Sequence, residues 1–154
     1  VAHKLVTKSH PLAGKPALIH SKFFPPLQGA KGKMSSSDPN SAVFLTDTPK
    51  QIAEKIKKHA FSGGQDTKAL QEQHGADLEV DVSYQWLRFF LEDDDELEAI
   101  GKSYGSGKGD YWNTSAVKDK LVSVLTDLVA EHQKRRAEVT MDVVKSWMEP
   151  RCIL

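Results

Sequence analysis

The sequence predicts a mainly α fold, in which a breaker-rich segment over residues 1–46 precedes an all-helical domain over residues 47–154. Apolar residues recur at the three- and four-residue spacing of helices in the second part. The first part contains repeated proline and glycine, which permit only short regular pieces. With 154 residues, of which 39% are hydrophobic and 27% charged, the chain has the composition of a globular protein that can bury a core.

One short strand is predicted in the first part. Residues 17–20 form an apolar run, which is typical of a mostly buried strand at the centre of a parallel sheet. Phe23 and Phe24 begin an apolar anchor that ends at Leu27, and a glycine-containing stretch over residues 28–32 follows it. Glycine gives the backbone conformational freedom. We therefore expect a fixed segment followed by a flexible loop.

The first helix of the second part has clear start and stop signals. Thr48 followed by Pro49 is a favourable helix start. Ile52 and the apolar residue four positions later mark the buried stripe, and the Ser-Gly-Gly sequence at residues 62–64 supplies a stop after about His59.

The central helices follow. Asp66 or Thr67 can cap a short helix. Residues 81–91 are the most apolar stretch of the chain, and their apolar side chains cover more than one helical face, so we expect a central helix here. The acidic run at residues 92–96 precedes another helix, where carboxylates complement the positive end of the helix dipole.

The last two helices are joined to the rest by a loop at about residues 105–113. A long helix is predicted over residues 114–139, with these residues on its inner side: Val117, Leu121, Val124, Leu125, Leu128 and His132. Thr140 is expected to cap a final helix that ends before Pro150. The predicted apolar anchors of that helix are Val143, Val144, Trp147 and Met148.

The segment Lys33-Met34-Ser35-Ser36-Ser37 is the strongest candidate for a functional site. A lysine on a glycine-flanked loop can reach triphosphate oxygens as a point charge, and the hydroxyls add hydrogen-bond donors. Taken alone, these five residues are also typical of a polar turn. The context favours phosphate binding, because a predicted strand and a Phe-Phe-Pro sequence precede the segment and Asp38-Pro39-Asn40 opens a turn after it.

The charge distribution supports the same region. The formal net charge is zero, but residues 1–60 contain ten lysines and three acidic residues, giving +7, while residues 61–154 contain eleven basic and eighteen acidic residues, giving −7. A positive region attracts polyphosphate or a nucleic-acid backbone. Lysines that simply solvate a surface are the alternative.

Other features narrow the class of protein. No apolar run reaches the length of a membrane span. The single cysteine, Cys152, excludes an internal disulfide and favours a reducing compartment, with the cytoplasm as the default. The histidines have no metal-ligand spacing, so no metal site is predicted. The chain starts at Val1 without an initiator methionine, and we expect this start to lie within a longer protein.

Several segments together carry a family resemblance that extends over nearly the whole chain. They are residues 16–21, 23–25, 27–29, 33–40, 44–48, 58–64, 89–95 and 130–133. In these segments the sequence resembles the eukaryotic tryptophanyl-tRNA synthetases, which are class I aminoacyl-tRNA synthetases. Tyrosyl enzymes carry a similar Lys-Met-Ser-Ser-Ser loop, so a tyrosyl relative is an alternative, although the later segments favour the tryptophanyl enzymes.

The resemblance implies a ligase that activates tryptophan with ATP, bound as its Mg²⁺ complex, and transfers the amino acid to tRNA(Trp). It implies that Lys33 contacts the triphosphate and that Met34, Ser35, Ser36 and Ser37 complete the ATP-binding loop. The family motif often has a second lysine where this chain has Ser36. The His-x-Gly-His partner motif of the family is absent from this sequence, so the isolated chain is expected to be inactive, and the complete enzyme is expected to be a homodimer.

The resemblance also assigns the two parts of the chain. Residues 1–46 correspond to the carboxyl-terminal piece of a Rossmann-type catalytic domain, and residues 47–154 to an anticodon-binding domain. Asp66 and Lys118 match family positions near the anticodon, with helix capping as the other interpretation of Asp66 and a solvated surface lysine as that of Lys118. A stand-alone helical RNA-binding or dimerisation module without catalysis is the alternative for the whole chain.

Overall fold

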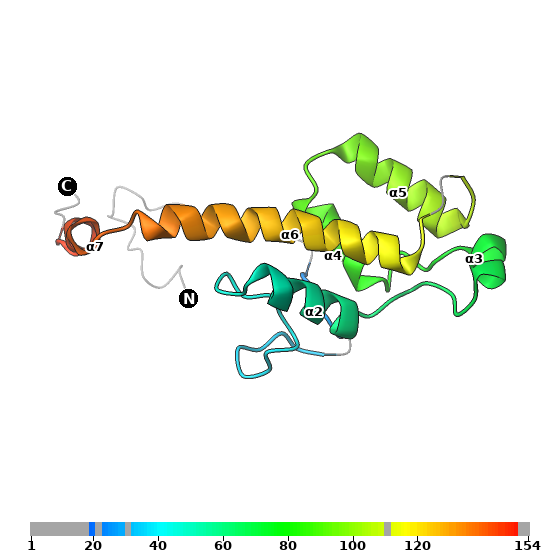
Figure 1. Cartoon of the computed structure of the whole chain (residues 1–154), viewed down its shortest axis with the longest axis horizontal. Coiled ribbons are helices and arrows are strands. Elements are labelled where there is room, and N and C mark those ends of the chain that lie inside the picture. The colour runs from blue at the N-terminus through cyan, green and yellow to red at the C-terminus, as the bar shows by residue number, and fades with distance from the viewer. Residues whose placement is uncertain (1–18, 21–22, 30–31, 110–111, 151–154) are drawn as a thin grey trace, which may run out of the picture.

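The structure confirms the mainly α fold. The computed structural model describes residues 19–20, 23–29, 32–109 and 112–150, and these contain six helices and no strand (Figure 1). The helices are α2 (Pro49–His59), α3 (Lys68–His74), α4 (Val82–Phe90), α5 (Asp94–Ser106), α6 (Thr114–Ala137) and α7 (Met141–Met148).

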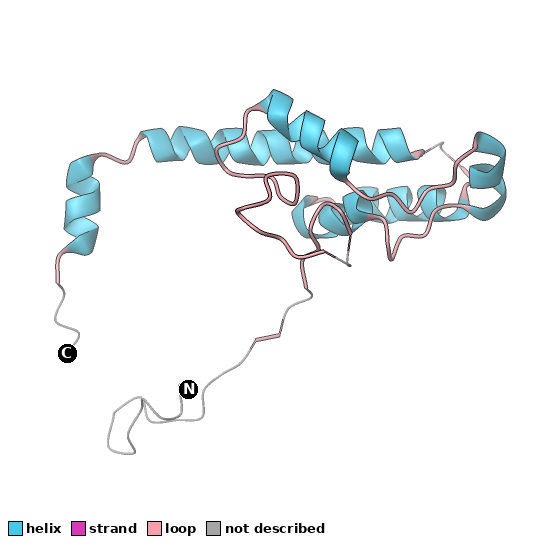
Figure 2. Ribbon diagram, turned by 90° about the horizontal axis from the view of Figure 1, so that it is seen from below, coloured by secondary structure: helices cyan, strands magenta, loops and turns pink. Residues whose placement is uncertain are grey.

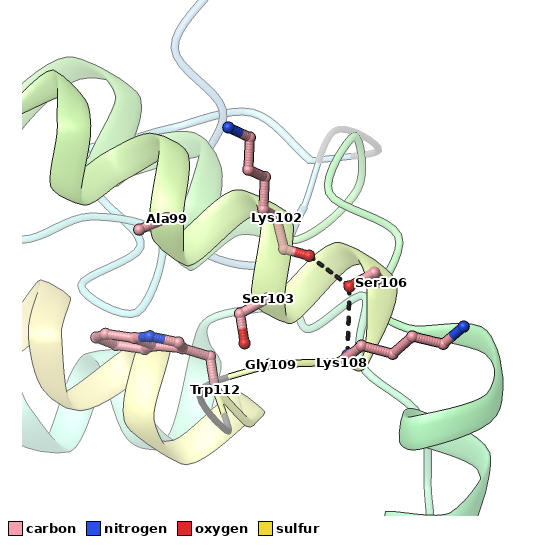
Figure 3. A pocket seen from close by; sticks show the side chains of 7 residues that line it. All are labelled: Ala99, Lys102, Ser103, Ser106, Lys108, Gly109 and Trp112. Atoms are coloured by element: carbon pink, nitrogen blue, oxygen red, sulfur yellow. Dashed lines mark hydrogen bonds between the residues drawn. The ribbon is translucent and has the colours of Figure 1, made fainter.

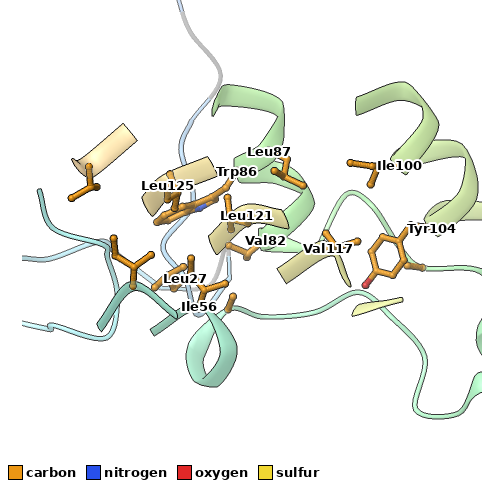
Figure 4. Close-up of a cluster of buried hydrophobic side chains, with 14 residues drawn as sticks. Leu27, Ile56, Val82, Trp86, Leu87, Ile100, Tyr104, Val117, Leu121 and Leu125 are labelled. Atoms are coloured by element: carbon orange, nitrogen blue, oxygen red, sulfur yellow. The ribbon is translucent and has the colours of Figure 1, made fainter. Parts of the chain in front are cut away.

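The long helix α6 is the spine of the molecule. Helices α2 and α4 pack against it, α5 contacts α4, and α3 contacts α5 (Figures 1 and 2). Helices α2, α4, α5 and α6 share one core, to which the segment before α2 contributes Leu27 (Figure 4). The fully or almost fully buried side chains of this core include Leu27, Ile52, Ile56, Val82, Trp86, Leu87, Ile100, Tyr104, Val117, Leu121, Leu125 and Val129.

The predicted start of the first helix is confirmed, with a full capping box. The Gln51 backbone N–H donates to Thr48 Oγ1 at 3.3 Å, and the Thr48 N–H donates to Gln51 Oε1 at 2.8 Å. Pro49 occupies the first turn, where its missing N–H leaves no hydrogen bond unmade. The helix ends at His59, as the sequence predicts.

Threonine and aspartate side chains begin the next helices. Thr67, and not Asp66, caps α3, because its hydroxyl accepts from the Leu70 N–H at 3.3 Å. Asp81 caps α4, and Asp93 caps α5, whose first turn contains three further acids from the predicted run. The prediction of a central helix at residues 81–91 is confirmed. Five residues of α4 are buried: Val82, Ser83, Gln85, Trp86 and Leu87.

The inner stripe of α6 was predicted only in part. Val117, Leu121 and Leu125 are buried, but Leu128 is 38% exposed and Val129 is buried in its place. The buried residues repeat every four positions, because α6 contacts its neighbours along one narrow face. Val124 and His132 are half-buried, and the helix ends two residues before the predicted boundary.

The predicted anchors of the last helix are wrong. No residue of α7 is buried, and Trp147 and Met148 are 72% and 78% exposed. Val143 is also exposed, while Val144 is half-buried. Figure 2 shows the reason: α6 extends beyond the other helices, and α7 lies at that extended end without a neighbouring helix of the bundle.

The strand predicted at residues 17–20 is also wrong for Ile19 and His20, the two of these residues that the structure describes. Ile19 and His20 are not in a strand, and Ile19 is 94% exposed; Ala17 and Leu18 lie outside the described residues. A strand needs a partner strand for its backbone hydrogen bonds, and the described part of this chain contains none.

A buried carboxylate joins several elements at one end of the bundle. Asp81 is 1% exposed, and its Oδ2 accepts from the Tyr104 hydroxyl at 2.9 Å, the Gly63 N–H at 2.9 Å and the Ser62 hydroxyl at 3.2 Å. Its Oδ1 accepts from the Tyr84 N–H at 2.9 Å. The carboxylate therefore connects α4, α5 and the segment after α2.

Tyr104 extends this network to α6. Its hydroxyl lies 3.0 Å from Thr114 Oγ1, at the first residue of α6, and Thr114 Oγ1 lies 3.1 Å from Ser62 Oγ. Burial and the nearby Asp81 charge raise the pKa of Tyr104 to about 12. The tyrosine is therefore neutral at physiological pH and can donate its proton to the carboxylate.

Replacement of Asp81 tests how much this network stabilises the fold. Asp81→Ala leaves several buried donors without an acceptor, and we expect it to lower the free energy of unfolding by about 3 kcal/mol or more. Asp93→Ala removes a helix cap of the same residue type at an exposed position, and we expect a loss of about 1 kcal/mol. Urea unfolding followed by circular dichroism measures both, and equal losses would contradict a special role of Asp81.

Candidate functional site

The segment before the Lys33 loop is fixed to the helical bundle by an aromatic cluster. The Phe24 ring lies 4.5 Å from the Trp86 ring and 5.1 Å and 5.6 Å from those of Phe89 and Phe90. The Trp86 indole N–H donates to the Pro25 carbonyl at 2.9 Å. The predicted apolar anchor is thus confirmed for Phe24, whereas the neighbouring Phe23 is exposed.

Backbone hydrogen bonds continue this attachment. Leu27 is fully buried, and its N–H donates to the Ser41 carbonyl at 2.9 Å. The Phe61 N–H donates to the Leu27 carbonyl at 2.8 Å, and the Val82 N–H donates to the Phe61 carbonyl at 3.0 Å. The two ends of the loop are therefore held side by side, at residues 27 and 41, and connected to the start of α4.

Ser41 closes the loop from within. It is fully buried, and its hydroxyl accepts from the Ser35 N–H at 3.1 Å. The same hydroxyl can donate to the carbonyl of Ser35, at 3.0 Å, or of Asp38, at 2.8 Å. One buried side chain thus fixes the Ser35 N–H, in the middle of the candidate site, and binds a carbonyl of the loop as well.

The other serines of the loop have different roles. Ser35 Oγ and Ser37 Oγ lie 2.7 Å apart, and the Ser37 N–H donates to Ser35 Oγ at 3.3 Å. Ser36 is exposed at the turn. The hydroxyls of Ser35 and Ser37 therefore shape the loop in this conformation, and Ser36 faces solvent.

Asp38 and Gln28 join the far end of the loop to its stem. Gln28 Nε2 donates to Asp38 Oδ2 at 3.1 Å, and the Asn40 N–H donates to Asp38 Oδ1 at 3.0 Å. These hydrogen bonds, the Gln28 bond foremost, keep the pKa of the Asp38 carboxyl below its usual value. Asp38 thus keeps its negative charge, and this acceptor maintains the turn that follows the loop.

Lys33 and Met34 lie in different surroundings. Met34 is half-buried and packs against the core, whereas Lys33 is exposed and forms no ion pair with the residues that the structure describes. The Gly32 N–H donates to the Gly29 carbonyl at 3.1 Å, and Gly29 has a positive φ of 96° that favours glycine. This arrangement presents a cation on a compact loop whose base is fixed, which suits an anionic ligand.

Asp66 lies on a different part of the bundle, on the segment between α2 and α3. Its side chain is exposed, and the capping interpretation is wrong because Thr67 is the N-cap of α3. The residue before it is held firmly: the Gln65 N–H donates to Gln71 Oε1 at 2.9 Å, and Gln65 Nε2 donates to the Gly75 carbonyl at 3.0 Å. The carboxylate is therefore displayed to solvent from a fixed backbone.

Lys118 on α6 is not a freely solvated lysine. It is half-buried, and its ammonium donates to the Lys57 carbonyl at 3.2 Å, near the end of α2. Burial lowers its pKa, and the Asp81 charge opposes that shift in part. A cation at a helix carboxyl end complements the helix dipole, so Lys118 also joins α2 to α6.

The structure does not bring all the predicted site residues together. Figure 1 shows the loop that contains Lys33 beside α2, away from α3 and the segment with Asp66. The roles of Ser41, Gln28 and the Asp81 network are not predicted from the sequence. The turn sequence Asp38-Pro39-Asn40 pointed to a local structure near Ser41, but nothing in the sequence indicated that its hydroxyl would be buried.

In the described part of the chain, no helix is long and apolar enough to cross a membrane. The described residues also contain no group of three histidine, cysteine or acidic side chains that could hold a metal ion.

Removal of the Ser41 hydroxyl tests the loop closure. Ser41→Ala takes away the acceptor of the Ser35 N–H, and we expect this amide to exchange with solvent about tenfold faster, in line with the loss of about one buried hydrogen bond. Ser36→Ala is the matched control, since Ser36 is exposed, and should leave the rate unchanged. Amide hydrogen exchange measures both variants. Equal rates in the parent chain and Ser41→Ala would show that another contact closes the loop.

Comparisons with known proteins agree with the resemblance. The family model of class I tRNA synthetases (W and Y) matches residues 1–108. The chain is 59% identical over 137 residues to the cytoplasmic tryptophan–tRNA ligase of Oryctolagus cuniculus and 58% identical to that of Homo sapiens. Each match covers 89% of this chain and 28% of the relative.

A solved structure shows the same arrangement of helices. The tryptophanyl-tRNA synthetase from Giardia lamblia superposes with a TM-score of 0.79 at 47% identity, over 84% of this chain and 31% of that protein. This chain therefore spans about a third of the length of its relatives or less. It belongs to the class I aminoacyl-tRNA synthetase family of the tryptophanyl and tyrosyl enzymes, and the relatives it matches are tryptophanyl enzymes.

Proposed function

We propose that this chain supplies the ATP-contacting loop and the tRNA-binding helices of a ligase that joins tryptophan to tRNA(Trp). The observation that carries the proposal is Lys33: an exposed lysine without an ion pair among the described residues, on a loop whose two ends are fixed by Leu27 and Ser41. The relatives that it matches are named as tryptophan–tRNA ligases, which supports the choice of amino acid.

The chemistry of amino-acid activation explains why a lysine would be needed on this loop. The carboxylate of the amino acid attacks the α-phosphorus of ATP, an acyl phosphate bond forms, and the bond to pyrophosphate breaks. Negative charge grows on the leaving pyrophosphate. The Lys33 ammonium would stabilise that charge, and a contact that strengthens in the transition state accelerates the step.

The remaining loop residues would place this cation. Met34 on the core and the Ser35 backbone held by Ser41 limit where the Lys33 backbone lies. Ser36 stands where the family motif often has a second lysine, so Lys33 would act with one cation fewer. Mg²⁺ would be bound to the phosphate oxygens of ATP and would neutralise part of their charge.

We also propose that residues 1–46 belong to the catalytic domain and residues 47–154 to an anticodon-binding domain, and that the complete enzyme is a cytoplasmic homodimer. Asp66 would accept hydrogen bonds from the edge of an unpaired base, because single-stranded bases are the usual targets of sequence-specific RNA recognition. The fixed Gln65 backbone supports this role of Asp66. Lys118 would act nearby through its charge, in addition to its contact with α2.

A chimeric enzyme tests the role of Lys33. The matching segment of the Oryctolagus cuniculus enzyme is replaced by this chain, and tryptophan-dependent exchange between ATP and pyrophosphate is measured. We expect an active chimera in which Lys33→Ala lowers kcat by roughly 10²–10³, with the KM for tryptophan changed by less than about twofold.

The control for this experiment is Lys50→Ala, which removes another exposed lysine and should leave exchange unchanged. An inactive chimera, or equal losses of kcat and tryptophan affinity in Lys33→Ala, would contradict the proposal.

Equilibrium binding of RNA to the present chain tests the role of Asp66. We expect the chain to bind tRNA(Trp) more tightly than a tRNA with a changed anticodon, and Asp66→Ala to weaken the cognate complex by about tenfold, the loss of one charged hydrogen bond. Asp127→Ala, which removes an exposed acid from α6, is the control and should have no effect. Equal binding of both tRNAs by the parent chain would argue against anticodon recognition.

A further inference from the structure

We propose that a pocket between α5 and the residues leading into α6 binds one unstacked nucleobase of single-stranded RNA. The pocket has a volume of about 400 Å³, within the usual range of ligand sites, and opens to solvent (Figure 3). Lys102, Ser103 and Ser106 line it from α5, and Lys108, Gly109 and Trp112 line it from the following loop. The inference rests on the proposed RNA-binding function and identifies a site for it that neither Asp66 nor Lys118 provides.

Trp112 gives the pocket a flat wall. The indole is half-buried and packs in part against the core, so its ring is held in place while it lines the pocket. An aromatic ring fixed in this way is a platform on which any base can stack, and such stacking stabilises an RNA complex by about 1–3 kcal/mol per base.

Gly109 keeps the entrance open. It has a positive φ of 91°, which favours glycine, and a Cβ atom at this position would lie 4.0 Å from Ser103 Oγ. Any larger side chain would extend into the space between the loop and α5. Glycine therefore both permits the positive φ of this turn and leaves the space of the pocket open.

The turn at the pocket has a defined shape. Ser106 Oγ donates to the Lys102 carbonyl at 2.6 Å and accepts from the Lys108 N–H at 3.2 Å, as Figure 3 shows. Two backbone groups of the wall are thereby fixed, so a base would meet a preformed surface.

The two lysines at the rim of the pocket are suited to contact the phosphate backbone of RNA. Among the described residues that line the pocket, the charged ones are two lysines. Figure 3 shows both ammonium groups pointing outward from the pocket. Lys102 pairs with Glu98 at 2.5 Å, whereas Lys108 is exposed and has no ion pair within the part of the chain that is described. Lys108 can therefore contact the phosphate next to a bound base.

The pocket lies at the same end of the bundle as Asp66. Gln71 Nε2 on α3 donates to the Tyr104 carbonyl on α5 at 3.0 Å, and a Cβ atom at Gly64 would lie 2.2 Å from Thr114 Oγ1. Figure 1 shows α3, the end of α5 and the start of α6 gathered at one end. One RNA strand crossing this end could contact both places, which favours RNA over an isolated small molecule.

Binding of a fluorescein-labelled anticodon stem-loop of tRNA(Trp) to the full chain tests the proposal. We expect Trp112→Ala to weaken binding by about tenfold and Trp112→Phe by less than about threefold, because phenylalanine retains a stacking face. Lys108→Ala, at an exposed position, should weaken binding moderately and reduce the slope of log K against log salt by about one charge. Trp147→Ala on α7 is the control and should change nothing.

The outcomes separate this site from the proposed function. If Trp112→Ala and Lys108→Ala both bind within about twofold of the parent while Asp66→Ala binds weakly, the pocket inference is wrong and the RNA-binding function stands. If the parent chain does not bind the stem-loop, both are wrong.

AMP tests a free nucleotide as the occupant: Trp112-dependent binding of AMP together with unchanged RNA binding would overturn the assignment to RNA. Circular dichroism checks that Trp112→Ala is folded. If it is not, the stem-loop binding of Lys108→Ala and Trp112→Phe tests whether the pocket binds a base.

Discussion

The buried carboxylate of Asp81 is the constraint on which one end of this molecule depends. A charge removed from water is tolerated only where several donors surround it, and here four donors do so from three parts of the chain. The segment after α2, the start of α4 and the end of α5 must therefore meet at one point. Through Thr114 the start of α6 joins them, which places the Asp66 segment and the Trp112 loop close together.

The loop with Lys33 depends on the bundle through a different kind of contact. Three successive backbone hydrogen bonds join Ser41 to Leu27, Leu27 to Phe61, and Phe61 to Val82, the residue directly after Asp81. Buried backbone groups need partners, so this ladder is broken only at a considerable free-energy cost. The candidate ATP-contacting loop and the candidate RNA-binding end are consequently attached to the same helix, α4.

Local signals in the sequence predicted most of the helices, because caps and apolar spacing act within a few residues. Thr48 with Pro49, Thr140 and the acidic run at the start of α5 all stand where they are expected. Long-range features could not be predicted in this way. Whether Trp147 is buried depends on which helix lies opposite, and the burial of Ser41 depends on the path of a segment more than ten residues away. Ile19 and His20 are not in a strand for the same reason, because a strand forms only beside a partner strand.

The different surroundings of Lys33, which is exposed, and Met34, which packs against the core, bear on how the loop can move. A displacement of the Lys33 backbone toward a ligand would have to withdraw the adjacent thioether from its apolar surroundings. Methionine is unbranched and flexible, so its side chain can follow such a shift and regain contacts in a new position. Met34 would then keep its apolar contact with the bundle while the Lys33 ammonium moves toward the ligand.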